Sequence, residues 1–328
     1  MQNDSNNGVV EKVPKQIGNH FNLIPGNSIS AFTHLNKVYY QEEPFYSKQG
    51  SNVYTLRNKF LNKPISKFIV SAINSVIGII EYGKNTASRL KNYKIQLPTK
   101  NGKIDFDFIE SFVAKLENEH ILQLENYINE IGLSDYHLTE KETQTLVDFE
   151  NGGIEFKDFT FKNIFNKIKQ GRRLKKDDQI AGNIPFVMSG VTDTGVVNYI
   201  SNPVANFPKN SITIDIFGNT FYRNYAYGAG DDTGVYWSDK TEYSKEIMVF
   251  FASAMAKSVL GKFDYGKKLR SSKSYDFKMT LPVKDGKPDY ETMETIISAI
   301  HKLVIKDVVL YVEKKKKELN KLTENANA

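Results

Sequence analysis

The sequence predicts an α+β fold of two repeated domains, each followed by a long helix, with the two helices paired as an antiparallel coiled coil. Three observations support this prediction. Similar segments recur in the same order in both halves of the 328-residue chain. Short strand-like runs alternate with turns rich in glycine, asparagine and aspartate. Two segments carry apolar residues at steps of three and four, which is typical of helices with one apolar seam.

The repeat is clearest where an apolar strand ends in Leu-Pro and is followed by a basic turn and a helix. Tyr82 and Tyr265 lie 183 positions apart, as do Asn27 and Asn210, so the spacing is kept over a long stretch. Several matches in register predict an internal duplication. The matching pairs are "KNYKIQLPTKNGKIDFDFIESF" (91–112) with "SYDFKMTLPVKDGKPDYETMETI" (274–296), "PGNSISAF" (25–32) with "PKNSITIDIF" (208–217), and "NNGVVEKVP" (6–14) with "DTGVVNYIS" (193–201).

The two copies differ at their beginnings. The second copy has the basic segment "FKNIFNKIKQGRRLKKDDQIAGNIPFVMSG" (161–190) before Gly195, whereas only seven residues precede the matching Gly8. We therefore expect the first domain to be truncated at its start, or to be completed by another chain. The predicted domains are 1–98 (the truncated first domain), 99–150 (a long spacer helix and linker), 151–283 (the second domain) and 284–328 (a C-terminal spacer helix).

Each copy combines strands and helices. The runs "SITIDIF" and "VVNYI" are strand-like, and amphipathic helices are predicted at 66–79 and 244–260. Each long helix after the Leu-Pro stop has roughly 25 residues and a length of about 35–40 Å. The apolar seams of these two helices favour pairing with each other. The alternative is that each seam packs on its own domain.

Composition and motifs exclude most enzyme classes. The chain has no cysteine, so disulfides, thiolate zinc sites and a cysteine nucleophile are excluded, and a cytoplasmic location is expected. No Gly-x-Ser-x-Gly, Gly-x-Gly-x-x-Gly or His-x3-His pattern occurs. The loops "GIIEYGKN" (78–85) and "GKFDYGKK" (261–268) resemble the start of a P-loop, but Asn85 and Lys268 replace its Ser or Thr. We therefore expect a non-catalytic protein with no metal site.

The net charge of +6 is modest, but the cations are clustered beside glycines and aromatics. Lys and Arg neutralise phosphates, while Arg, Asn, Ser and Thr can reach base edges. Three segments of the second copy (167–177, 218–230 and 265–275), Thr192, and one loop of the first copy (84–91) are therefore candidate DNA contacts, with a solvated surface as the alternative for each cluster. The candidates are Arg172, Arg173, Lys175, Lys176, Thr192, Asn219, Arg223, Asn224, Lys267, Lys268, Arg270, Ser272 and Lys273 in the second copy, and Lys84, Asn85, Arg89 and Lys91 in the first.

With these motifs, the sequence resembles the specificity (S) subunit of type I restriction–modification systems, and the related recognition subunits of bifunctional type II systems. The resemblance lies in "GRRLKKDDQIAGNIPFVMSGVTDTGVVNYI", in the strands ending in Leu-Pro, and in "NGKIDFDFIESFVAKLE" with its echo at 286–303. It covers most of the chain and is strongest at 80–130 and 161–303.

The resemblance implies two target-recognition domains, each recognising one half of a split double-stranded DNA target, with the two long helices as a ruler. It also implies methyltransferase (M) partner subunits that use S-adenosylmethionine and, in type I systems, restriction (R) subunits that use ATP and Mg²⁺. No cofactor is expected on this chain, and no membrane. Two alternatives stay open: the recognition portion of a fused endonuclease–methyltransferase, and a mimic that binds the methyltransferase without DNA.

Overall fold

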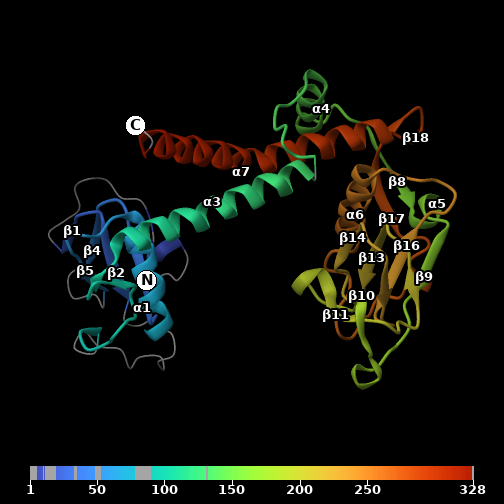
Figure 1. The fold of residues 1–328 in the computed structure, drawn as a ribbon. Coiled ribbons are helices and arrows are strands. Elements are labelled where there is room, and N and C mark those ends of the chain that lie inside the picture. Colours follow the sequence, from blue (N-terminus) through green and yellow to red (C-terminus); the bar gives the residue numbers. More distant parts are fainter. Residues whose placement is uncertain are drawn as a thin grey trace. The chain divides into compact units, whose positions relative to one another are not determined.

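The computed structural model describes residues 6–9, 11, 20–32, 35–48, 53–77, 90–130 and 132–326. These residues form two compact units, which Figure 1 shows with their helices and strands labelled. Unit 1 comprises Met1–Tyr127 and Val312–Ala328, and unit 2 comprises Ile128–Tyr311. The two longest helices, α3 and α7, contribute residues to both units.

Unit 1 is built around a three-stranded antiparallel sheet in the order β3-β2-β5. Helix α1 packs on this sheet, because Ile65 and Ile69 lie one turn apart and face the apolar side of β2. The elements described are η1 (Asn6–Gly8), β1 (Phe21–Ile24), β2 (Ser28–Phe32), β3 (Lys37–Gln41), β4 (Phe45–Lys48), β5 (Val53–Leu56), α1 (Lys63–Ile77), β6 (Thr99–Lys100), β7 (Lys103–Ile104) and α3 (Phe106–Glu130).

Unit 2 contains the corresponding sheet with one more strand, in the order β14-β13-β16-β9. A second four-stranded sheet, β11-β10-β15-β12, and a three-stranded sheet, β18-β17-β8, complete it. The elements are α4 (Glu140–Glu150), β8 (Phe156–Thr160), α5 (Phe161–Ile164), β9 (Lys167–Gln170), η2 (Lys176–Asp178), β10 (Ala181–Val187), η3 (Thr192–Gly195), β11 (Val196–Ile200), β12 (Asn206–Phe207), β13 (Ser211–Asp215), β14 (Thr220–Arg223), β15 (Tyr227–Ala229), β16 (Thr233–Trp237), α6 (Lys245–Val259), η4 (Ser271–Lys273), β17 (Lys278–Lys284), β18 (Lys287–Pro288) and α7 (Tyr290–Ala326).

The central strand of unit 2, β13, is buried on both faces, and its alternating sequence decides what lies on each. Ile212 and Ile214 belong to the main apolar core together with residues of α6. Their neighbours Ser211, Thr213 and Asp215 point the other way and are hydrogen-bonded. Strand β2 has the same alternation, with Ile29 and Ala31 in the core of unit 1.

The duplicated "P-x-N-S" segments form the same staple in both units. Asn27 and Asn210 both adopt left-handed backbone conformations, with φ of 53° and 58°. Asn27 donates a hydrogen bond to the carbonyl of Leu61 and accepts one from the hydroxyl of Tyr40. Asn210 makes the matching bonds, to the carbonyl of Tyr243 and from the hydroxyl of Tyr222. In unit 1 this staple joins the start of β2 to β3 and to the residues before α1. In unit 2 it joins the start of β13 to β14 and to the residues before α6.

The duplicated Leu-Pro junction is a tight hairpin followed by a helix cap. Its turn residues, Asn101-Gly102 and Asp285-Gly286, all have positive φ, as a two-residue type I′ turn requires. Asp105 and Asp289 follow these turns, and their side chains accept hydrogen bonds from the backbone N–H groups of Phe108 and Thr292. A carboxylate at this place caps the first turn of a helix, so the junction starts α3 and α7 in the same way.

The predicted α+β class is confirmed, with a long helix after each Leu-Pro junction. Helix α1 begins three residues earlier than predicted, because the side chain of Asn62 caps it by accepting a hydrogen bond from Ile65 N–H. Within unit 1, Lys316 on α7 forms a 2.6 Å ion pair with Glu125 on α3, so the two helices are in contact there. Their antiparallel direction and the predicted domain boundaries stay predictions.

Candidate nucleic-acid interface

Two of the predicted cationic segments of unit 2 meet around one backbone carbonyl. Arg270 Nη1 donates to the carbonyl oxygen of Asp231 at 2.6 Å, and Gln170 Nε2 donates to the same oxygen at 3.0 Å. The Gln170 side-chain oxygen accepts the N–H of Ser271 at 2.9 Å. These bonds bring the end of β9, the 229–232 turn and η4 together, although roughly 100 residues separate the first from the last.

A groove of about 590 Å³ lies beside this junction. Its lining combines three exposed cations with three apolar side chains, Leu174, Met188 and Val197, and with amide groups. Cations suit phosphate oxygens, while apolar and amide side chains suit base edges, so this combination fits a nucleic-acid duplex. The lining residues are Arg173, Leu174, Lys175, Lys176, Gln179, Met188, Val197, Asn198 and Asp231.

Most predicted contact residues lie on the surface. Asn219 is half-buried, and its side-chain amide donates to Asp215 at 2.8 Å. The loop containing Lys84, Asn85 and Arg89 lies outside the described residues. The exposed candidates are Arg172, Arg173, Lys175, Lys176, Thr192, Asn224, Lys267, Lys268, Arg270, Ser272 and Lys273 in unit 2, and Lys91 in unit 1.

Arg223 is a correction to the prediction, because it is only 1% exposed and cannot contact a DNA surface directly. Its Nε donates to Thr213 Oγ1 at 3.1 Å, and its Nη1 donates to Thr194 Oγ1 and to Tyr225 Oη, both at 2.9 Å. Its Nη2 donates to the carbonyl oxygen of Thr194 at 2.5 Å. A buried guanidinium requires such partners, and here they all belong to the protein.

The loop between α6 and η4 keeps its cations exposed. Asp264 accepts the N–H groups of Gly266 and Lys267, both at 2.8 Å, and this closes the turn. The ammonium groups of Lys267 and Lys268 lie 5.9 Å and 4.7 Å from the ring centres of Phe263 and Tyr265. Both cations therefore stay available to a phosphate in solvent.

Two aspartates that the sequence analysis did not select position the loop between β10 and β11. Asp215 is 4% exposed and accepts four N–H donors: Gly190 N (3.0 Å), Phe217 N (2.8 Å), Asn219 N (3.0 Å) and Asn219 Nδ2 (2.8 Å). Asp232 accepts the N–H of Ser189 at 3.0 Å. Asp215 is one of the polar residues that alternate with isoleucines along β13. This alternation in the sequence could have predicted a buried carboxylate with a structural role.

Acidic residues do not gather into a metal-ligand group anywhere in the described part of the chain. Tyr227 is buried on β15, and its hydroxyl shares a 2.9 Å hydrogen bond with Ser211. Burial raises the pKa of Tyr227, and the Ser211 bond only partly offsets this, so the phenol stays neutral at physiological pH.

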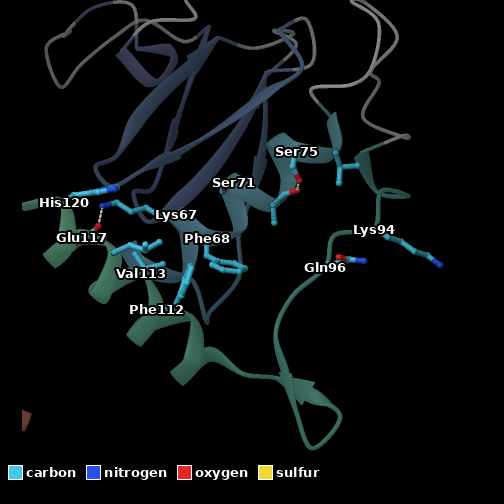
Figure 2. Close-up of a pocket in the computed structure, with 13 residues that line it drawn as sticks. Lys67, Phe68, Ser71, Ser75, Lys94, Gln96, Phe112, Val113, Glu117 and His120 are labelled. Atoms are coloured by element: carbon cyan, nitrogen blue, oxygen red, sulfur yellow. Dashed lines mark hydrogen bonds and ion pairs between the residues drawn. The ribbon is translucent and has the colours of Figure 1, made fainter. Parts of the chain in front are cut away.

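A different hollow, of about 700 Å³, lies in unit 1 between α1, α3 and residues 94–96 (Figure 2). Phe68 and Phe112 meet edge to face at 6.1 Å, and Val113 lies beside them. Lys67 is paired with Glu117, so its charge is already partly neutralised. The apolar floor and the paired lysine distinguish this hollow from the cationic groove of unit 2.

The two units match one known protein family. The match is to the type I restriction modification DNA specificity domain, over residues 2–126 and again over residues 153–311. The chain belongs to this family. It therefore carries two DNA specificity domains of the restriction–modification type, and the predicted resemblance is confirmed.

Individual relatives agree with this assignment. The specificity subunit of the type II restriction enzyme BcgI from Heyndrickxia coagulans is 26% identical over 275 residues, covering 82% of this chain and 76% of the relative. The type I restriction–modification S subunit from M. genitalium has the same fold, with a TM-score of 0.56 and 17% identity over 92% of this chain and 82% of that structure. Among the described residues, no helix is both long and apolar enough to cross a bilayer.

Proposed function

We propose that this chain is a non-catalytic specificity subunit that directs methyltransferase subunits to a split DNA target, with each unit recognising one half. The observation that carries the proposal is the double family match, together with the staple and the hairpin–cap junction that recur in both units. Two copies of one recognition scaffold on one chain suit a target with two different halves.

The cationic groove of unit 2 supports DNA as the ligand of that unit. Lys and Arg side chains contribute affinity without sequence preference, because phosphates are the same at every base pair. Selectivity must then come from the neutral side chains of the groove, such as Asn198 and Gln179, and from the nearby loop tips. Both kinds of side chain line the same groove.

We assign the chemistry to partner subunits. S-adenosylmethionine belongs to the methyltransferase partner in this proposal, and ATP with Mg²⁺ belongs to a restriction partner if the system is of type I. The described residues of this chain contribute positioning and selectivity in this proposal. Asp215 and Asp232, which hold the loop between β10 and β11, accept backbone N–H groups.

The test is methylation with purified components. We expect the full chain alone to neither methylate nor cut duplex DNA. Mixed with its cognate methyltransferase subunit and with S-adenosylmethionine, it should direct methyl transfer to one defined motif, and the methyltransferase alone should not. Methylation or cleavage by the isolated chain would overturn the non-catalytic assignment. Motif-independent methylation by the mixture would overturn the specificity role.

A further inference from the structure

A buried polar clamp recurs in both units beneath a surface turn. In unit 2, Arg223 at the end of β14 reaches Thr213 on β13 and the backbone carbonyl of Thr194 in the turn Thr192–Gly195. In unit 1, Gln41 at the end of β3 makes the matching pair of bonds. Its Nε2 donates to Ser30 Oγ on β2 at 2.8 Å and to the carbonyl of Asn7 at 2.9 Å.

The two turns also correspond residue by residue. Asn7 and Thr194 have φ of 54° and 50°, and the glycines after them, Gly8 and Gly195, have φ of 78° and 86°. Each glycine is packed so closely that an added Cβ would force its neighbours to move. It would lie 2.4 Å from the ring of Phe32 in unit 1 and 2.6 Å from the carbonyl oxygen of Met188 in unit 2. Non-glycine residues in this region are strained, so the turns keep this shape only because their surroundings hold it.

The turn in unit 2 is held from further directions while its tip stays free. Asp215 accepts Gly190 N–H and Asp232 accepts Ser189 N–H, which anchors the approach to the turn. Arg223 lies near the rings of Phe221 and Tyr227, with its Cζ 5.3 Å and 5.8 Å from their centres. Val191, Thr192 and Asp193 are exposed at the tip, and Val191 is 68% exposed.

Recognition of a DNA base pair requires an exposed turn whose backbone is held rigidly by the rest of the protein. Side chains that distinguish base pairs must be placed to within a fraction of an ångström, and their own hydrogen bonds to the protein achieve this. A turn needed only for folding would not require the side chains of Val191, Thr192 and Asp193 to stay in solvent at its tip. Thr192 can donate or accept a hydrogen bond, and Val191 can contact a thymine methyl group.

We infer that Arg223 and Gln41 are positioning residues for DNA specificity. Each holds a base-contacting turn from beneath, Thr192–Gly195 in unit 2 and Asn6–Gly8 in unit 1, and so sets the selectivity at one half of the target. The inference rests on the proposed function, and it adds which turns recognise the two halves and which buried side chains place them.

The repeat provides a matched rescue. Arg223→Met removes every donor and matches glutamine, the rescue side chain, in length. Arg223→Gln installs the side chain that performs the same two bonds in unit 1, so it should reach Thr213 and the Thr194 carbonyl again. Gln41→Leu removes the clamp of unit 1. Asn210→Ala removes both staple hydrogen bonds of unit 2 and leaves the residues of both turns unchanged, so it serves as the control for lost stability alone.

The measurement uses the full chain in complex with its methyltransferase subunit. Duplexes carry the motif that the wild-type complex methylates, or that motif with one base pair changed in one half, and their dissociation constants are compared. We expect Arg223→Met to lower the ratio of affinities for the cognate and the changed duplex by about tenfold or more at one half of the motif. This is within the range of affinity loss that a single base-pair change usually causes. The ratio at the other half should stay the same. Gln41→Leu should lower the ratio at the opposite half. Arg223→Gln should stay close to the wild type, and Asn210→Ala should lower the melting temperature with both ratios unchanged.

The contrary outcomes separate the two claims. Unchanged ratios in Arg223→Met and Gln41→Leu, with a selective wild type, would overturn the positioning role alone. An Arg223→Gln complex as unselective as Arg223→Met would show that an amide cannot replace the guanidinium bonds to the turn, and it would overturn the equivalence of the two clamps. An equal loss of the affinity ratio at both halves would show that Arg223 and Gln41 contribute only to stability, and it would overturn their positioning role. A wild-type complex with no defined motif would overturn the proposed function itself.

Discussion

Units 1 and 2 share a scaffold and differ on the surface that the scaffold presents. Both contain the asparagine staple, the Leu-Pro hairpin with its aspartate cap, and an apolar strand face packed on a helix. Their polar clamps differ, with Gln41 in unit 1 and Arg223 in unit 2. The duplication thus preserves residues that set backbone geometry, whereas the residues that face the turns have diverged.

This difference has a physical reason. A residue in a left-handed turn or at a helix cap has few acceptable substitutes, because the backbone conformation itself depends on it. A clamp residue needs only donors at the right distance, and both an amide and a guanidinium have them. Divergence at such positions can change what a turn presents without changing the fold, as two halves of an asymmetric target require.

The largest effect is expected from lengthening α3, which tests whether the units act as two modules on a ruler. Four residues inserted after Leu124 add one helical turn, about 6 Å, and displace Glu125 from Lys316. We expect the methylated motif to keep both halves and to gain about two base pairs of spacer, at 3.4 Å per step. An unchanged spacer would show that the helices do not set the distance, and complete loss of binding would place α3 in a domain core.

The next largest effect is expected from replacing Glu142 on α4, a helix of unit 2 that follows α3. Glu142 on α4 is buried and accepts hydrogen bonds from Ser298 (2.6 Å), from Lys302 (2.9 Å) and from the backbone N–H of Thr139 (2.8 Å). Burial alone would raise the pKa of Glu142, but the hydrogen bonds from Ser298, Lys302 and Thr139 outweigh it and lower the pKa from 4.5 to about 2.

A carboxyl group with a lowered pKa stabilises the fold above pH 4.5, and this stabilisation is lost as the pH falls towards 2. We expect Glu142→Gln to cost about 3 kcal/mol of unfolding free energy at pH 7 and progressively less below pH 4.5. Denaturant unfolding followed by fluorescence of Trp237, the single tryptophan of the chain, reports on unit 2. Glu140→Gln, on the exposed face of the same turn, should change little, and equal losses in both variants would contradict this account.

A smaller effect, equal in both units, is expected from removing the staples. Asn27→Ala and Asn210→Ala each leave a tyrosine hydroxyl and a backbone carbonyl without their partner, and each places alanine at positive φ. We expect each to cost its own unit about 1–2 kcal/mol, measured by hydrogen exchange resolved along the chain. Losses that differ severalfold between the units would show that the staple is not equivalent in the two copies.

The smallest effect concerns the exposed lysines of the 265–275 loop. Lys267→Ala with Lys268→Ala should weaken binding to all duplexes and reduce the salt dependence of log K by about one to two units of slope. Lys141→Ala with Lys287→Ala removes the same charge at α4 and β18, which lie at the other end of unit 2 from β10 and β11 (Figure 1). A slope equally reduced in both double variants would mean that the loop acts only through net charge.

The repeat, the strand and helix pattern and the cationic segments could all be predicted from the sequence, because each depends on local residue order. The convergence of Gln170, Asp231 and Arg270 could not, since it depends on how distant loops fold together. Arg223 was misassigned for the same reason. From the sequence alone, an arginine among aromatic residues fits a DNA-contacting surface as well as it fits a buried site. Only the folded structure, which places Thr213 and Thr194 beside Arg223, distinguishes the two.

If each unit independently recognises one half of a split target, exchanging one unit should change one half of the motif alone. Residues 153–283 are replaced by the corresponding segment of a family member that directs methylation to a different motif, and the methylated sites of cells with the original and exchanged chains are mapped. We expect one half of the motif to change to that of the donor while the other half and the spacer stay the same. A motif that is unaltered, or altered in both halves, would contradict it.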